Sequence, residues 1–231
     1  MLISRAYCPN MQKGYSDCSN SKIMFDNIKI AKIKTFLALS DLSATQETDM
    51  IDLALSLSDQ DDKDLALEEI AVMLASRGKY DRAYEVLNKV TLGYERAEGN
   101  TKVASLLASS GRKEEALEFL QNAETAAIQA RSHWQVAELL HNMANCLVSI
   151  HERDEAIRIL NQAISYAQEG EITGNPQDSL DSSSVLADIS LALAKIGEKD
   201  RAYDVAFSIK SSRKRKRAID WLTDNSPKSQ N

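Results

Sequence analysis

The sequence contains little of what tight turns and β-sheets require. Its 231 residues include eight glycines and three prolines, and aromatic residues make up only 6% of the chain. Few turn formers and few aromatic or β-branched runs argue against a β-sandwich or a β-barrel. The frequent Ala, Leu, Glu, Lys and Ser residues favour helices instead. We therefore expect an all-α protein.

Cysteine and histidine are also scarce, with three residues of each type. The odd number of cysteines, and the distance of Cys146 from Cys8 and Cys18, argue against a disulfide framework and favour a reducing compartment. We therefore predict a cytoplasmic protein. A zinc site at Cys8 and Cys18 would need two further ligands at short spacing, and no histidine precedes His133. We predict no metal and no other cofactor.

Long apolar runs and an excess of positive charge are missing as well. No run of about eighteen uncharged apolar residues is present, so we expect no membrane span. The N-terminal residues MLISRAYCPNMQKGYSD have no apolar core of signal-peptide length. The net charge of −6 gives the whole chain no general attraction for nucleic acid. We expect the partner to be neither a membrane nor a nucleic acid.

What the sequence does have is a fourteen-residue pattern that occurs four times. The copies are LASRGKYDRAYEVL at 74–87, LASSGRKEEALEFL at 107–120, LVSIHERDEAIRIL at 147–160 and LAKIGEKDRAYDVA at 193–206. In three copies a glycine stands five residues before an alanine, as Gly78 before Ala83, Gly111 before Ala116 and Gly197 before Ala202. In the remaining copy His151 stands at the glycine position before Ala156.

Apolar residues at helical spacing precede and follow each of these junctions, so each unit is predicted to be two amphipathic helices joined by a tight turn. The glycine would end the first helix in a left-handed conformation, which His also tolerates better than most residues. The small alanine lets the two helices approach closely. One hairpin cannot bury its own apolar faces, so we expect successive hairpins to stack and share a core.

The repeat also sets the expected domain boundaries. Clear repeats cover 64–210, within a helical domain over 28–222. The stretch EGEITGNPQDSLDSSS, rich in glycine and serine, predicts an exposed loop at about 169–184. The polar ends, 1–27 and 223–231, are expected to be disordered.

These units resemble the tetratricopeptide repeat family. The resemblance rests on the glycine at the turn, the alanine after it and a small residue within the first helix. That small residue is Ala71, Ala104, Ala144 or Ser190 in the four units. The resemblance implies a right-handed α-solenoid of about four to five helical hairpins. It also implies a non-catalytic scaffold whose first helices line a concave groove for a peptide or helix of another protein.

The same resemblance assigns groove positions to this chain. Mapping the first helices gives Glu68, Val72 and Ala75; Thr101, Ser105 and Ala108; His141, Asn142 and Asn145; and Ala187, Asp188 and Leu191. We select Thr101, Ser105, His141, Asn142, Asn145, Asp188 and Leu191 as the candidate partner-binding residues. Asn145 matches an asparagine that some family members use to bind a C-terminal carboxylate. The accompanying lysines and arginine are missing, so that function is not carried over.

Three other functions stay open as alternatives. The groove could bind a small peptide or metabolite, which would make the chain a regulatory sensor. A Cys146–His141 pair could form a nucleophile, but no Gly-rich turn is present to supply an oxyanion hole. Self-association could follow from exposed solenoid ends, or from attraction between the basic run RKRKR at 213–217 and the acidic segment 58–64. Otherwise we interpret the basic run as an exposed inter-helix loop.

Overall fold

The structure is a computed structural model that describes residues 15–225, with side chains described from Ile23 onward. Every regular element in this part of the chain is an α-helix. The eleven helices are α1 (Tyr15–Leu37), α2 (Ala44–Leu55), α3 (Gln60–Ser76), α4 (Tyr80–Leu87), α5 (Gly93–Ser109), α6 (Lys113–Ala127), α7 (His133–Ser149), α8 (Arg153–Ile172), α9 (Pro176–Lys195), α10 (Lys199–Ser208) and α11 (Ser212–Asp224). None of these described helices combines the length and the hydropathy needed to cross a bilayer.

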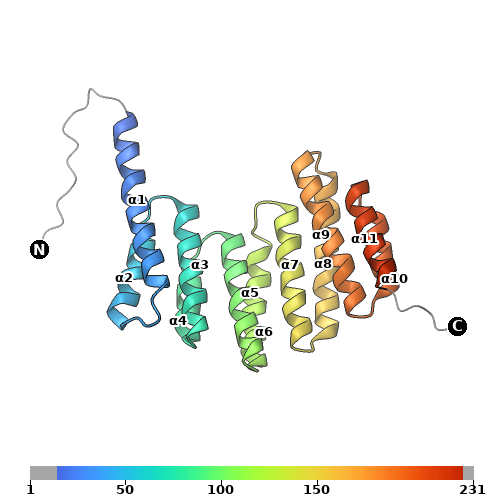
Figure 1. The fold of residues 1–231 in the computed structure, drawn as a ribbon, viewed down its shortest axis with the longest axis horizontal. Coiled ribbons are helices and arrows are strands. Elements are labelled where there is room, and N and C mark those ends of the chain that lie inside the picture. Colours follow the sequence, from blue (N-terminus) through green and yellow to red (C-terminus); the bar gives the residue numbers. More distant parts are fainter. Residues whose placement is uncertain (1–14, 226–231) are drawn as a thin grey trace, which may run out of the picture.

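The helices are arranged in chain order across the molecule, from α1 at one end to α10 and α11 at the other (Figure 1). The odd-numbered helices form one layer, because α3, α5, α7 and α9 each pack against the next odd-numbered helix, up to α11. Each even-numbered helix packs against the odd-numbered helices before and after it. The protein is thus all-helical with consecutive helix packing.

One hydrophobic core runs through nearly the whole stack, from Ile33 of α1 to Leu222 of α11. The four alanines that follow the predicted turns, at positions 83, 116, 156 and 202, are completely buried in this core. At this position the contact between the two helices of each unit therefore has room for a methyl side chain and for nothing larger.

The four repeated junctions are built in the same way. The φ angles of Gly78, Gly111 and Gly197 are 76°, 74° and 92°, and His151 takes a φ of 64° in the equivalent place. The next residue donates its N–H to the carbonyl oxygen five positions back, with N···O distances of 3.0 Å for Lys79–Leu74, 3.0 Å for Arg112–Leu107, 2.9 Å for Glu152–Leu147 and 2.9 Å for Glu198–Leu193. This is the Schellman ending of a helix, which requires the left-handed conformation.

The predicted loop at 169–184 is wrong. Helix α8 continues to Ile172 and α9 begins at Pro176, so only residues 173–175 connect them. Gly170 lies within α8, where a β-carbon would overlap with Ser182 Oγ of α9. Ser182 and Ser183 are buried. The glycine and serines that suggested a loop are small residues at a close helix–helix contact.

The structure also differs from the prediction at both ends. Helix α1 begins at Tyr15, so residues 15–27 are helical rather than disordered, while 1–14 lie outside the described residues. Its buried Asp26 accepts the N–H of Ser58 at 3.0 Å, which attaches α1 to the segment before α3. At the other end α11 continues to Asp224, and 226–231 lie outside the described residues.

Two charged segments lie at the beginnings of helices, the basic run at α11 and the acidic segment at α3. The basic run 213–217, interpreted above as a loop, forms the first turns of α11. The acidic segment 58–64 contains Asp59, whose side chain caps α3 by accepting the N–H groups of Asp61 and Asp62. Aspartate at the first turn of a helix suits both the free N–H groups and the helix dipole.

Candidate partner-binding groove

A groove lies between α5 and α7 and encloses about 260 Å³. Four of the seven predicted partner-binding residues line it: Thr101 and Ser105 from α5, and Asn142 and Asn145 from α7. The other lining residues are Glu98, Lys102 and Leu139. Because Leu139 is only 1% exposed, the groove has an apolar floor and a polar rim.

Local hydrogen bonds fix which groups the groove offers to a ligand. The hydroxyl of Thr101 donates to Ala97 O at 2.8 Å, and the hydroxyl of Ser105 donates to Thr101 O at 3.0 Å. Their oxygens therefore remain available only as acceptors. Asn142 and Asn145 are exposed. Their amides supply both donors and acceptors to the same groove.

The remaining predicted residues lie beside this groove rather than in it. His141 Nε2 lies 3.2 Å from Asn145 Nδ2. Burial lowers the pKa of His141, which nearby Asp188 raises and Lys195 lowers further, so the ring is neutral at neutral pH. Asp188 and Leu191 line a second hollow of about 360 Å³ between α9 and α11.

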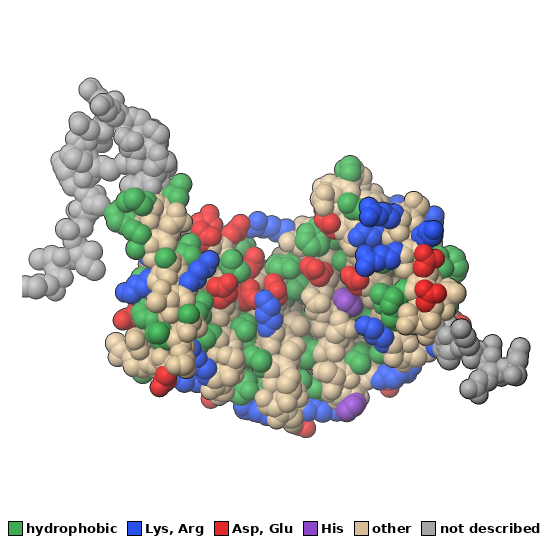
Figure 2. Space-filling view, in the orientation of Figure 1, with side chains coloured by type: hydrophobic (Ala, Val, Ile, Leu, Met, Phe, Trp, Pro, Cys, Tyr) green, Lys and Arg blue, Asp and Glu red, His purple; other side chains and the backbone are tan. Residues whose placement is uncertain are grey.

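Acidic side chains on the odd-numbered helices form what we call the acidic stripe. Its members are Glu68 of α3, Glu98 of α5, Glu138 of α7, and Asp181 and Asp188 of α9. Figure 2 shows acidic side chains gathered over α3, α5 and α7, and Lys and Arg side chains gathered over α11. The carboxylates affect one another, because Glu98, Asp188 and Asp181 add to the burial that raises the pKa of Glu138.

Hydrogen bonds connect the stripe across three helices. Lys102 Nζ lies 2.8 Å from Glu68 Oε1 and 2.8 Å from Glu98 Oε1, which joins α5 to α3. The hydroxyl of Tyr94 donates to Glu138 Oε2 at 3.2 Å, which joins α5 to α7. The stripe is therefore held in place by cross-helix contacts.

Glu98 and Lys102 are groove residues that the sequence did not predict. A usable signal is present, because Glu98, Thr101, Lys102 and Ser105 follow one another at spacings that place them on one helical face. Glu and Lys four residues apart more often belong to a solvated helix surface, which makes this signal weak. The structure shows instead that this Glu–Lys pair borders the groove.

Cys146 does not have the electrostatics of an activated nucleophile. The Cys146 thiol is buried, and burial raises its pKa. An activated cysteine needs a lowered pKa, since the thiolate is the attacking species. His141 Nε2 is hydrogen-bonded to Asn145 Nδ2 instead. Within the described residues, no three His, Cys, Asp or Glu side chains are grouped so that they could bind a metal ion, and the side chains of Cys8 and Cys18 fall outside that part.

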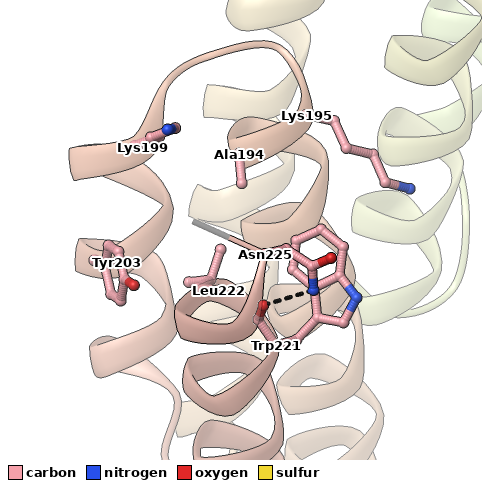
Figure 3. Close-up of a pocket in the computed structure, with 7 residues that line it drawn as sticks. All are labelled: Ala194, Lys195, Lys199, Tyr203, Trp221, Leu222 and Asn225. Carbon is pink, nitrogen blue, oxygen red and sulfur yellow. Dashed lines mark hydrogen bonds between the residues drawn. The ribbon is translucent and has the colours of Figure 1, made fainter. Parts of the chain in front are cut away.

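A smaller pocket of about 150 Å³ lies at the C-terminal end of the stack (Figure 3). Helix α10 contributes Tyr203, α9 contributes Ala194 and α11 contributes Trp221, and Asn225 follows the end of α11. Asn225 Nδ2 donates to the carbonyl oxygen of Trp221 at 2.9 Å. Trp221 also lines the hollow between α9 and α11, so this side chain borders both the pocket and the hollow.

Comparisons with known proteins add no name to this description. The sequence matches no protein-family model, and no curated protein matches it. The assignment of a function therefore rests on the helices, the groove and the charges of the described residues.

Proposed function

We propose that the chain is a divergent tetratricopeptide-like scaffold, a right-handed α-solenoid that binds a partner peptide or helix along its odd-numbered helices. The four equivalent Schellman junctions support a repeat of helical hairpins. The packing supports curvature, because the odd-numbered helices contact one another while the even-numbered helices pack mainly on the odd layer. In a curved stack of hairpins the more closely spaced layer lies on the concave side.

The observation that carries the proposal is the groove between α5 and α7. Two successive first helices each contribute two of the predicted residues to it, together with Glu98 and Lys102. Asn142 and Asn145 offer amides to a peptide backbone. The acidic stripe on either side favours Lys or Arg side chains, since opposite charges promote association and like charges oppose it. We therefore propose a partner segment that carries positive charge.

The exposure of the groove favours a macromolecular partner over a metabolite. Ser105, Asn142 and Asn145 on its rim are exposed, whereas small-molecule sites bury most of the surface of their ligand. The sensor alternative therefore receives less support than the scaffold. The buried Cys146 thiol, whose pKa is raised, gives the enzyme alternative no activated nucleophile.

A displayed library of random peptides, selected on the immobilised chain, tests this proposal. We expect the enriched peptides to carry Lys or Arg, and to be lost when Ser105, Asn142 and Asn145 are all changed to alanine. A matched control variant changes Asn88, Gln121 and Asn122 to alanine, because these residues are exposed and belong to or border even-numbered helices. Equal enrichment on the groove variant and the wild type would remove the groove from the proposal.

A further inference from the structure

The basic run of α11 is an exposed group of cations without ion-pair partners among the described residues. Arg215 donates a hydrogen bond to the carbonyl oxygen of Ile209 at 3.2 Å. Arg213, Lys216 and Arg217 are exposed, and Lys214 and Arg215 are half-buried. Within the described residues none of the five forms an ion pair. They occupy the first turns of the helix, where the helix dipole disfavours positive charge. An anionic surface placed against α11 would give these cations ion-pair partners and would offset their unfavourable interaction with the helix dipole.

The same molecule presents such a surface. The acidic stripe and the basic run are visible on one face of the protein, the stripe over the middle of the stack and the run at its end (Figure 2). Within one copy, α7 and α9 lie between α5, which carries Glu98, and α11. The basic run therefore cannot reach the centre of its own stripe, and a second copy of the chain can.

We propose that two copies of this chain associate face to face, with α11 of each copy against the acidic stripe of the other. A two-fold arrangement forms the contact between basic run and acidic stripe twice and closes the assembly at a dimer. The hollow between α9 and α11 lies on the path of this contact. Lys214, Arg217 and Asp188 line it together with the apolar side chains of Leu191 and Trp221. A side chain of the second copy can be buried there, which adds an apolar contact to the charged ones.

This inference goes beyond the proposed function and does not require it, but a second copy and a partner segment would compete for the acidic stripe. Partner binding is tested above through the uncharged residues Ser105, Asn142 and Asn145, whereas association between copies is tested through charges. A chain that binds peptides but stays monomeric would overturn only the inference.

Sedimentation velocity of the full chain provides the test. At about 20 mM salt, where the screening length is roughly 20 Å, we expect a species of twice the 25.6 kDa chain mass. At about 500 mM salt we expect the dissociation constant to rise at least about tenfold, because screening weakens exposed charge contacts. A chain that stays monomeric at about 100 μM in low salt, or a dimer insensitive to salt, would overturn the proposal.

Charge reversal identifies the surfaces. One variant changes Arg213, Lys214 and Arg217 to glutamate, and the other changes Glu98 and Glu138 to lysine. We expect each variant alone to be monomeric and an equimolar mixture of the two to recover the dimer, because the reversed stripe then attracts the reversed run. A control that changes the exposed Lys34, Lys89 and Lys199 to glutamate should still dimerise. A mixture that stays monomeric while both variants show the wild-type helical circular dichroism would contradict the proposal.

Discussion

Glu68 is a charged side chain that the fold buries between α3 and α5. It is 2% exposed, and Gly99 of the next odd-numbered helix leaves room for it, since a β-carbon there would lie 2.9 Å from Glu68 Cγ. Burial raises the pKa of Glu68 from 4.5 to about 6, although Lys102 acts in the opposite direction. At neutral pH the protein therefore holds a buried carboxylate at some cost in stability.

The substitution Glu68→Gln should stabilise the protein at high pH only. Because the folded-state pKa lies above the unfolded value, the stability due to Glu68 is fully present below pH 4.5 and is lost as pH rises through about 6. Glutamine stays neutral, and Lys102 keeps Glu98 as a partner. We expect the free energy of unfolding in urea to rise by about 1–2 kcal/mol at about pH 7.5 and to change little near pH 4.5.

The exposed neighbour Glu69 supplies the control for this measurement. Glu69→Gln should alter the free energy of unfolding by less than about 0.5 kcal/mol at either pH. If Glu68→Gln shifts stability equally at both pH values, burial of its charge is not the cause.

For single residues, the sequence predicted backbone conformation better than it predicted the burial of side chains. The positive φ of His151 could be expected because the residue is in register with three turn glycines. The burial of Glu68 could not, because it depends on Gly99 and Lys102, which belong to a different helix. Burial of a polar side chain is decided by what the neighbouring element places over it.

Among the elements, α8 and α9 show most clearly how small residues position helices. Gly170 of α8 faces Ser182 of α9, and a β-carbon at position 170 would also lie 3.2 Å from the Cβ of His133. Ser182 Oγ is buried and has no hydrogen-bond partner. Close approach of the two helices thus leaves the hydroxyl unsatisfied, a condition that costs about 1–3 kcal/mol.

The substitution Gly170→Ala should destabilise the protein although alanine is the better helix former. The new β-carbon overlaps with Ser182 Oγ and crowds His133. We expect the overpacking penalty to exceed the gain of about 1 kcal/mol in helix propensity, for a net loss of about 1–2 kcal/mol in urea unfolding. Adding Ser182→Ala should restore most of the loss, and Ser182→Ala alone should cost nothing. A Gly170→Ala variant as stable as the wild type would show that α8 and α9 are not closely packed here.

This contact also explains which elements the sequence predicted poorly. The helices around the four repeated junctions follow from apolar spacing and turn residues. The segment 169–184 was assigned to a loop because glycine and serine serve both turns and close helix contacts, and composition does not distinguish the two uses. The groove residues of α5 and α7 were predicted through the resemblance to the tetratricopeptide repeat family, whereas the charges flanking them were not.

In the molecule as a whole, stability should vary along the stack. The pairs α5–α6 and α7–α8 are the most extensively packed, and further helices flank them on both sides, whereas α1 and α11 have neighbours on one side only. In stacked repeats each unit depends mainly on its neighbours, so the ends unfold locally. We expect amide hydrogen exchange to be slowest in α5–α8 and to quicken towards α1–α2 and α10–α11.

Mass spectrometry after exchange for seconds to hours would measure this profile. Rates corrected for the intrinsic exchange of each peptide segment separate packing from sequence effects. A single rate shared by all helices would mean that the protein opens as one cooperative unit, contrary to this expectation.

The arrangement of the helices in chain order has a consequence for how the protein is made. Nearly all of the extensive contacts join helices that are adjacent or next but one along the chain. Such a protein has a low contact order, which favours rapid folding because few long loops must close. Each hairpin can pack against its predecessor as it leaves the ribosome, so the nascent chain exposes only a short length of apolar helix at any moment.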